Sequence, residues 1–250
     1  MTLIKGLLIL EVFLNTDNDQ SLSNISNLTR LNISTTHRIC NMLERHGYLN
    51  RNPRTKKYAL GHKILSLSTS LTRKDRLCNV AHSYMQKLCQ DFKEVINLAI
   101  LDNLEAVVVH RVETNRTLVP QHRIGTRFAL HCTSVGKVLL AGLEDKALNQ
   151  ILNQIELKPL TKYTITSKEK LLQDIFLVKQ RGYAINDREL NEEIRAIGAP
   201  IKSANGEVIA AINIDAPVHR TPLWKLKQFA PKLIETAVSI SKDMGYIVNE

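Results

Sequence analysis

Residues 33–45 carry hydroxyl, amide and guanidinium groups at a spacing that could read the edges of DNA bases. At about 100° per residue, the polar side of a helix over this segment comprises Ser34, Arg38, Asn41 and Arg45. The opposite side is suited to a core and comprises Ile33, Thr36, Ile39, Cys40 and Leu43. Arginine pairs with guanine O6 and N7, and asparagine pairs with adenine N6 and N7. The residues predicted to read bases are therefore Ser34, Thr35, Arg38 and Asn41.

The charge around this segment distinguishes a DNA-reading helix from an ordinary solvated helix face, which is the alternative interpretation. Between residues 30 and 74 a single acid, Glu44, is outnumbered by ten basic residues: Arg30, Arg38, Arg45, Arg51, Arg54, Lys56, Lys57, Lys63, Arg73 and Lys74. Surface helices are normally balanced by acid–base pairs four residues apart, whereas this region repels itself unless phosphates neutralise it. The predicted phosphate contacts are Arg45, Arg51, Arg54, Lys56 and Lys57.

The flanking residues predict the elements that position these side chains. Residues 22–29 have the apolar spacing of a short helix with Ser21 as its N-cap, and residues 30–32 form the turn before the reading helix. Residues 49–51 and 57–60 predict two short strands around a basic, turn-rich tip. Residues 2–13 predict a mostly buried support helix. This order predicts a winged helix-turn-helix domain over residues 1–61, with the helix-turn-helix motif at about 21–45 and double-stranded operator DNA as its partner.

The composition limits the remaining function classes. The chain has 250 residues, of which 44% are hydrophobic and 23% charged, as expected for a soluble protein with two domains. Its net charge of +10 is concentrated early in the chain, which favours nucleic acid as the partner. No run of about 18 apolar residues could span a membrane, and Lys5 and Glu11 interrupt the first apolar stretch, so no signal peptide is expected. We predict a cytoplasmic protein with no membrane partner.

The cysteines and histidines do not form a metal-binding pattern. Cys40, Cys78, Cys89 and Cys132 lack CxxC spacing, and the eight histidines lack HxxxH and HExxH spacing. Scattered, buried thiols without disulfides are therefore expected. The sequence predicts no structural zinc site and no cofactor, and it leaves open a metal site assembled from distant residues.

Residues 49–60, the two strands and the tip between them, form the predicted wing. After the wing the chain changes from helical to mixed character. Residues 62–75 predict a linker helix whose apolar stripe either packs on its own domain or pairs with a second copy. A helix is expected at 76–92, and β-rich runs at 95–101 and 104–112 flank the hairpin signal Asp102-Asn103. Further strands are expected at 183–186, 194–202 and 207–215, with helices capped by Thr133 or Ser134, by Ser167 and by Thr221. This pattern predicts an α+β domain over residues 76–247 with a mainly antiparallel sheet.

Several motifs, in one order along the chain, resemble a known family. The first domain carries STTHR at 34–38, GYL at 47–49 and YALG at 58–61. The second carries HCTSVGKVLLA at 131–141, RGYA at 181–184, IRAIGAPI at 194–201 and AAINI at 210–214. Together these motifs resemble the isocitrate lyase regulator (IclR) family of bacterial transcription regulators, and the resemblance spans almost the whole chain.

The resemblance implies that the second domain is a GAF-like effector-binding domain for a small carboxylate or aromatic acid. It also implies homodimers or homotetramers on palindromic operators. The effector-binding residues that it implies for this chain are Thr133, Ser134, Val135, Asn186, Ala196, Asn213 and Asp215. Relatives that bind keto acids have an acid in place of Asn186, a cysteine in place of Ala196 and hydroxyls in place of Asn213 and Asp215. These departures argue against a family-typical glyoxylate or pyruvate site.

The pocket chemistry can also be argued from the residues themselves. A helix that begins near Ser134 offers free N–H groups and a positive dipole end to an anion. Asp215, if it faces the pocket, repels a carboxylate and favours a ligand with hydroxyl or amine groups, such as a sugar acid or a polyol-like compound. Arg111, Arg127 and Arg195 could supply charge, although a structural salt bridge is the simpler interpretation of each.

Three functions remain as alternatives. The favoured one is a DNA-binding regulator of a catabolic operon that is controlled by a small organic acid or sugar acid. The second is a constitutive DNA-binding regulator with a degenerate sensor domain. The third is an enzyme, but the chain lacks GxSxG, P-loop and GxGxxG motifs, and the adjacent His131 and Cys132 point to opposite faces of an extended segment. We therefore predict no enzyme and no catalytic residues.

Overall fold

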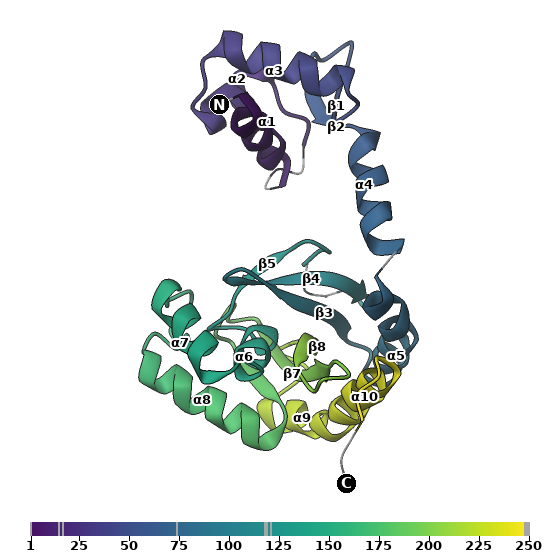
Figure 1. Cartoon of the computed structure of the whole chain (residues 1–250), viewed down its shortest axis with the longest axis vertical. Coiled ribbons are helices and arrows are strands. Elements are labelled where there is room, and N and C mark those ends of the chain that lie inside the picture. The colour runs from purple at the N-terminus through teal and green to yellow at the C-terminus, as the bar shows by residue number, and fades with distance from the viewer. Residues whose placement is uncertain are drawn as a thin grey trace. The chain divides into compact units, whose positions relative to one another are not determined.

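The computed structural model describes residues 2–14, 16, 18–73, 75–117, 120 and 122–247. Lys74 and the side chain of Arg73, both in the predicted basic set, lie outside what it describes. The chain divides into two compact units, Met1–Asp75 and Arg76–Glu250 (Figure 1). Each unit has its own hydrophobic core.

The first unit is a helix-turn-helix followed by a small β-hairpin. Its elements are α1 (Thr2–Glu11), the 3-10 helix η1 (Val12–Leu14), α2 (Leu22–Thr29), α3 (Ile33–Arg45), β1 (Leu49–Arg51), β2 (Tyr58–Leu60) and α4 (His62–Arg73). The predicted cap Ser21 accepts the Asn24 N–H through Oγ at 3.2 Å, and Asn32 Oδ1 accepts the Thr35 N–H at 2.8 Å. These caps satisfy backbone donors that the first turn of each helix leaves free.

A small core fixes the angle between α2 and α3. Ile25 of α2 and Ile39 and Cys40 of α3 are buried together with Ile9 of α1 and Tyr58 of the hairpin. Burial of apolar side chains stabilises the unit by about 1.5–3 kcal/mol for each large residue. The predicted core side of α3 therefore faces inward, and its polar side is left outside.

Some apolar residues are exposed where the sequence suggested burial. Along α1 the exposed side chains, with their exposed fractions, are Leu3 (76%), Ile4 (63%), Leu7 (50%) and Leu8 (39%). The prediction of a mostly buried support helix is wrong, because only the stripe around Ile9 packs on the neighbouring helices. Ile33 is 57% exposed because it begins α3 beside the turn, away from the core stripe.

The second unit is built on a six-stranded antiparallel sheet with the strand order β5-β4-β3-β8-β7-β6. Its strands are β3 (Val95–Asp102), β4 (Glu105–Val112), β5 (Arg127–Ala129), β6 (Ala184–Asp187), β7 (Ile194–Lys202) and β8 (Val208–Pro217). Its helices are α5 (Arg76–Phe92), α6 (Ser134–Ala141), α7 (Asp145–Gln154), α8 (Lys168–Arg181), α9 (Leu223–Gln228) and α10 (Ala230–Asp243). The predicted α+β class, with a helix-turn-helix unit ahead of an antiparallel sheet, is confirmed.

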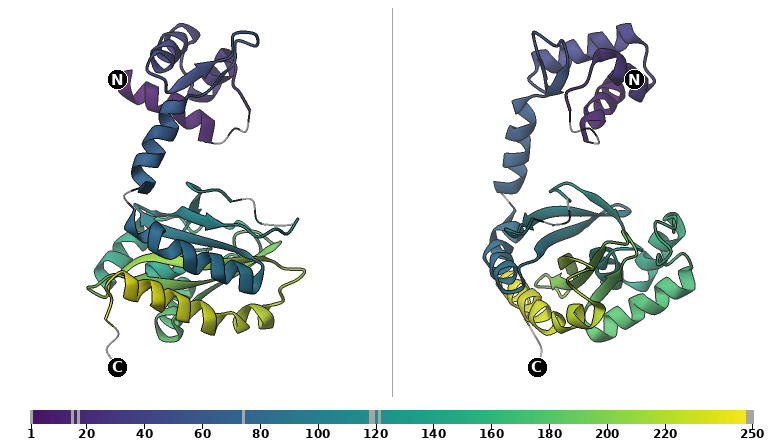
Figure 2. Two further views of the ribbon diagram at one scale, coloured as in Figure 1. Left: turned by 90° about the vertical axis from the view of Figure 1, so that its right-hand side faces the viewer. Right: turned by 180° about the vertical axis from the view of Figure 1, so that it is seen from behind.

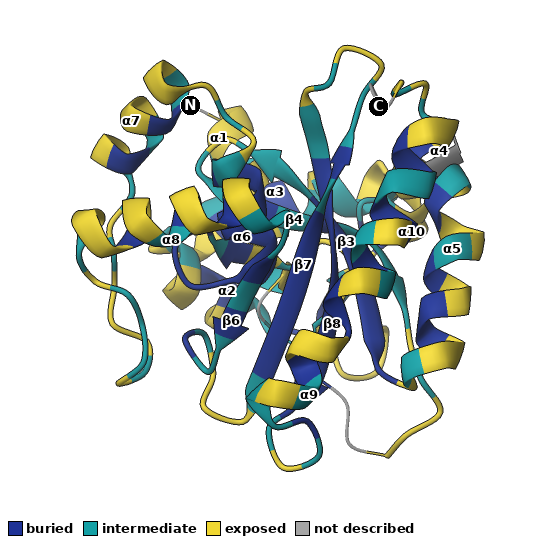
Figure 3. Cartoon of the chain, turned by 90° about the horizontal axis from the view of Figure 1, so that it is seen from below, coloured by how far each residue is buried: buried dark blue, intermediate teal, exposed yellow. Residues whose placement is uncertain are grey.

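Helices cover both faces of this sheet (Figure 2). Helices α5, α9 and α10 pack on the face that carries Ile212 and Ile214, whereas α6, α7 and α8 pack on the other. Because side chains alternate along a strand, Asn213 and Asp215 of β8 point toward α6. Figure 3 shows that β7 is buried along most of its length, while the outer sides of α5, α8 and α10 are exposed. The polar residues of the α6 face therefore lie inside the unit.

Four features of this unit differ from the sequence pattern. Strand β5 and helix α7 were not expected, because neither has a strong flanking signal. The last helix is broken into α9 and α10 at Phe229, since Pro231 cannot donate the backbone hydrogen bond of a continuous helix. Thr221 does not cap it: Pro222 occupies the N-cap position, and the buried Thr221 hydroxyl has no hydrogen-bond partner among the described residues.

Candidate DNA-binding surface and effector pocket

The outer side of α3 carries the side chains predicted to read bases. Ser34, Arg38 and Arg45 are exposed, and Thr35 and Asn41 are half-buried. The capping oxygen Asn32 Oδ1 also accepts the Ser34 hydroxyl at 3.0 Å, which fixes the first turn. His37, which the face argument did not include, shares this surface, with Nε2 3.4 Å from Asn41 Nδ2. An exposed helix side with these groups matches the donors and acceptors of the major groove.

The hairpin presents cations at its tip. Asn52 Oδ1 accepts the backbone N–H groups of Arg54 and Thr55 at 2.9 and 3.1 Å, which closes the turn. The exposed cations there are Arg54, Lys56 and Lys57. Arg51 lies instead over the ring of Tyr58, with its guanidinium carbon 5.4 Å from the ring centroid. Such a charged hairpin beside α3 is suited to phosphate contact.

A small cavity lies between the start of α6 and the sheet. The structure brings together all the predicted effector-binding residues in its lining: Thr133, Ser134, Val135, Asn186, Ala196, Asn213 and Asp215. Residues that sequence reasoning missed complete it: His122, Phe128, Leu190 and Ile194. The cavity has a volume of about 10 Å³, which is roughly the space for one water molecule. A larger ligand therefore requires side chains to move apart.

The start of α6 points two backbone donors at this cavity. Thr133 is the N-cap: its Oγ1 accepts the Gly136 N–H at 3.1 Å, and its carbonyl accepts the Lys137 N–H at 3.0 Å. The N–H groups of Ser134 and Val135 remain at the positive end of the helix dipole, where anions are favoured. A Cβ at Gly198 would lie 3.2 Å from the Ser134 carbonyl carbon, so a glycine there lets α6 begin directly against the sheet.

A hydrogen-bonded network connects the cavity floor to Arg111. Asp215 accepts the side-chain amides of Asn213 at 2.7 Å and Asn97 at 2.9 Å. Asn213 also donates to Ser134 Oγ at 3.2 Å, and Arg111 donates to Asn97 Oδ1 at 2.9 Å. The side chain of Arg111 is only 5% exposed. Asn97 was missed, although an amide inside the apolar run of residues 95–101 is a signal that could have found it.

Asp215 faces the cavity, and burial raises the pKa of its carboxyl from 3.8 to about 6. The Arg111 guanidinium and the amides of Asn97 and Asn213 oppose this rise, because each favours the carboxylate. At neutral pH the group is mostly ionised and accepts hydrogen bonds. It would therefore repel a ligand carboxylate and accept a ligand hydroxyl or ammonium group.

The raised pKa of Asp215 predicts how stability depends on pH. The folded protein holds this proton more tightly than the unfolded chain, so the stabilising contribution is present below pH 4 and is lost as the pH rises through about 6. The loss is on the order of 3 kcal/mol. Urea unfolding of the wild type and Asp215→Asn from pH 4 to 8 measures it. We expect the free energy of unfolding to decrease over this pH range in the wild type only. If it depended on pH in the same way in both proteins, Asp215 would not be the group responsible.

The remaining candidate residues have other partners. Asn186 Oδ1 accepts the Glu189 N–H at 2.8 Å, so it shapes the turn after β6. Arg127 forms exposed salt bridges with Asp102 and Glu105. Arg195 donates to Asp187 at 2.6 Å. Arg127 and Arg195 are thus structural, whereas Arg111 belongs to the pocket network.

The pair His131 and Cys132 cannot work as a nucleophile and base. Burial raises the pKa of the Cys132 thiol to about 12, and the residue is 0% exposed. His131 is directed to the Lys158 carbonyl, with Nε2 3.1 Å from that oxygen. A protonated, inaccessible thiol is a poor nucleophile. All four cysteines are buried, as predicted.

A buried lysine anchors α6, the helix that begins at the cavity. Lys137 of α6 is 1% exposed, and its Nζ lies 2.6 Å from Glu189 Oε1 and 2.7 Å from Asp174 Oδ2. It also donates to the Ile185 carbonyl at 3.1 Å. These contacts connect α6 to α8 and to the segment around β6. Sequence reasoning missed this role, because none of the partners is near Lys137 in the chain.

Two features, a metal-binding cluster and a membrane-spanning helix, are absent from the described residues. These residues contain no group of three or more His, Cys, Asp or Glu side chains placed to hold a metal ion. None of the helices among them is long and apolar enough to cross a membrane.

Comparison with known proteins identifies both units. The family model described as bacterial transcriptional regulator IclR C-terminal matches residues 69–242, and the IclR helix-turn-helix domain matches residues 2–53. The transcriptional regulator XynR of Escherichia coli is 28% identical over 97% of this chain and 96% of its own length. The regulator KdgR of Dickeya chrysanthemi is 32% identical over 90% of this chain and 74% of its own.

A solved structure has the same fold over both units. It is an IclR homologue from Microbacterium hydrocarbonoxydans in complex with 4-hydroxybenzoate, with a TM-score of 0.85 and 26% identity over 98% of this chain and 99% of that one. The families and relatives are transcriptional regulators and not enzymes, so the enzyme alternative is wrong. This chain belongs to the IclR family of bacterial transcriptional regulators, which bind DNA through a helix-turn-helix domain.

Proposed function

We propose that this regulator reads its operator through α3 and the wing and that a small organic acid in the second unit controls the binding. The observation that carries the proposal is the polar, cation-rich outer side of α3, which lies beside the exposed cations of the hairpin. The base-reading residues are Ser34, Thr35, Arg38 and Asn41, and the phosphate contacts are Arg45, Arg51, Arg54, Lys56 and Lys57. We assign residues 1–61 to the DNA-binding domain, 62–75 to the linker and 76–247 to the effector-binding domain.

The cavity chemistry supports an acid with hydroxyl groups as the effector. A ligand carboxylate would bind the N–H groups of Ser134 and Val135, because the helix dipole favours an anion there. Ligand hydroxyls would donate to Asp215 and accept from Asn213. The related structure in complex with 4-hydroxybenzoate holds a compound with both groups. A sugar acid has the same combination and is the class that we favour for a catabolic operon.

The effector proposal is tested by thermal melting of the full chain with a panel of sugar acids and hydroxybenzoates. A ligand at 100 times its Kd stabilises the folded state by about 2.7 kcal/mol. We expect one class to raise the melting temperature of the wild type and to have no effect on Asp215→Ala. If the protein is instead a constitutive regulator, we expect that no ligand changes the melting temperature and that none changes operator affinity.

The exposed face of α1 supports pairing of two copies. Leu3, Ile4, Leu7 and Leu8 form one apolar side of this helix and are at least 39% exposed. Neighbouring apolar residues at the surface mark an interaction site. A second copy is the partner that a two-fold symmetric operator requires. We therefore propose a homodimer, or a homotetramer made of such dimers, in which α1 contributes to the contact between DNA-binding domains.

Charge placed on that face should break the pairing. We expect Leu3→Lys/Ile4→Lys to lower operator affinity at least tenfold, because two half-sites are then bound independently. Leu14→Lys is the control: Leu14 is as exposed as Leu3, at 76% for both, but lies in η1. Analytical ultracentrifugation and operator titration measure both effects. Unchanged mass and affinity in the double variant would exclude α1 from the interface.

A further inference from the structure

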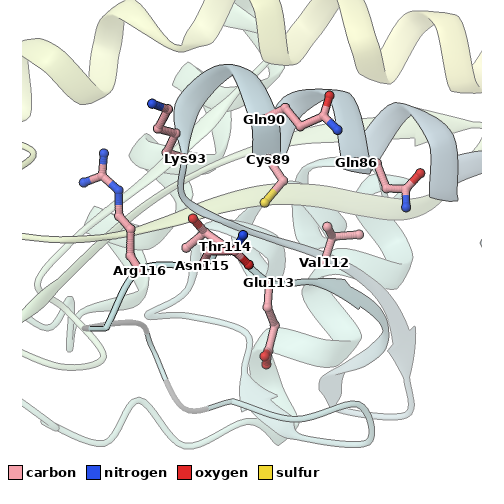
Figure 4. Close-up of a pocket in the computed structure, with 9 residues that line it drawn as sticks. All are labelled: Gln86, Cys89, Gln90, Lys93, Val112, Glu113, Thr114, Asn115 and Arg116. Atoms are coloured by element: carbon pink, nitrogen blue, oxygen red, sulfur yellow. The ribbon is translucent and has the colours of Figure 1, made fainter.

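A second, larger cavity lies at the C-terminal end of α5, next to the end of β4 (Figure 4). Its volume is about 570 Å³, within the range of small-molecule sites. Cys89 and Val112 form the apolar part of its lining, and the amides of Gln86, Gln90 and Asn115 supply polar groups. None of these residues belongs to the effector pocket.

Positive charge is in excess around this cavity. Its lining includes Lys93 and Arg116, both exposed. The buried Glu94 lies next to them in the chain, but its carboxylate already accepts two Arg220 nitrogens, at 2.7 and 2.6 Å, while Arg116 approaches it only to 3.8 Å. The cavity's own acid, Glu113, is paired with Arg111 at 2.9 Å. Each carboxylate therefore has a closer arginine. The long contact with Glu94 offsets the charge of Arg116 only in part, and net positive charge remains at Lys93 and Arg116 for a ligand.

The end of α5 weakens this positive field without cancelling it. A helix C-terminus carries about half a negative charge, and here the Cys89 carbonyl already accepts the Lys93 N–H at 2.8 Å. Two full positive charges exceed that partial charge. The site therefore favours an anion, and two cations favour a dianion.

The rim of this cavity is connected to the effector pocket. Glu113 accepts Arg111 Nε at 2.9 Å, and the same guanidinium donates through Nη1 to Asn97 at 2.9 Å. Asn97 donates to Asp215 at 2.9 Å. A dianion bound beside Glu113 would repel this carboxylate, alter its pairing with Arg111 and thus change the charge balance at Asp215. Such a continuous polar network can carry coupling between two sites.

We propose that this cavity is a second small-molecule site, for a compact dianion such as a dicarboxylate or a phosphate monoester, and that Glu113 and Arg111 couple it to the effector pocket. Lys93 and Arg116 pair with the two negative charges, and the amides of Gln86, Gln90 and Asn115 provide hydrogen bonds. The coupling rests on the proposed effector function, whereas anion binding itself does not.

NMR titration of the ¹⁵N-labelled full chain tests the site. Inorganic phosphate and succinate are added separately at constant ionic strength, and the backbone amides of Lys93, Thr114 and Asn115 are followed. Saturating shifts with either probe support the site and identify the anion class. In Lys93→Gln/Arg116→Gln we expect at least tenfold weaker binding, since charged hydrogen bonds are lost. Shifts that do not saturate, or equal binding by the double variant, would overturn the proposal.

Two further variants separate the site from its surroundings. Lys87→Gln is the matched control, because Lys87 is an exposed lysine of the same helix outside the cavity lining, and we expect wild-type binding. Glu113→Gln tests the coupling: the local shifts should persist, while the probe-induced shifts of Asn213 and Asp215 disappear. If the probes caused no shifts at Asn213 and Asp215 in the wild type, the coupling would be disproved, but anion binding at the cavity would not. Anion binding in a protein that responds to no effector would disprove only the proposed effector function.

Discussion

Replacing Arg38 by alanine is expected to weaken operator binding by about 1–3 kcal/mol per half-site and to relax the preference at one base position. Arg38 lies on the exposed polar side of α3, where its guanidinium can make a bidentate contact with guanine. Loss of that contact affects the cognate base far more than the others. Titration of the operator and of its single-base variants measures both the affinity and the preference.

Lys57→Ala provides the contrast. Lys57 is an exposed cation of the wing rather than of α3, and a phosphate contact carries no base information. We expect this variant to weaken binding to all sequences alike and to reduce the slope of log K against log salt by about one unit. If Arg38→Ala and Lys57→Ala changed affinity, base preference and salt slope identically, α3 would not be the recognition helix.

Replacing Lys137 by alanine is expected to lower the free energy of unfolding of the second unit by about 3–5 kcal/mol. The side chain is 1% exposed and neutralises the buried Glu189, so its removal leaves that carboxylate without its cation, whereas Asp174 keeps its contact with Arg181. Burial already raises the pKa of Glu189 despite Lys137. Urea denaturation followed by the fluorescence of the single tryptophan, Trp224 of α9, measures the loss in this unit.

Two further variants test whether the loss of stability comes from the buried charges. Lys137→Met/Glu189→Gln removes a charge of each sign, and we expect it to recover at least half of the loss, because uncompensated charge is the main penalty. Lys179→Ala breaks the exposed pair with Asp145 and should cost less than about 1 kcal/mol. Similar losses in Lys137→Ala and Lys179→Ala would mean that the buried lysine contributes no more than a surface pair.

Local patterns were enough to predict the parts of the fold that depend on neighbouring residues. Ser21 and Thr133 cap helices because their short hydroxyls reach backbone donors three residues ahead. The inward and outward sides of α3 follow from helical periodicity alone. The strands containing Asn213 and Ala196 were located by their apolar runs, and the family resemblance supplied their pairing with the start of α6 in one pocket.

Features that depend on distant contacts could not be predicted. Asn97 meets Asp215 only because β3 and β8 are neighbours in the sheet, and strand order is not encoded in any short segment. The ion pair of Lys137 could not be predicted for the same reason, since Glu189 lies 52 residues further along the chain. The apolar pattern of α1 predicts a buried face but cannot say whether the burial occurs within one chain or between two. The exposed Leu3 and Ile4 favour the second case.

The most direct test of specific DNA reading is fluorescence anisotropy of the full chain on duplex DNA from upstream of its own gene. A duplex of shuffled sequence is the control, and both are titrated at two salt concentrations. Specific reading of the operator predicts tighter binding to the upstream duplex, with a steep loss of affinity as salt rises, because several phosphate contacts release counterions. Binding of equal strength to both duplexes at both salt concentrations would contradict it.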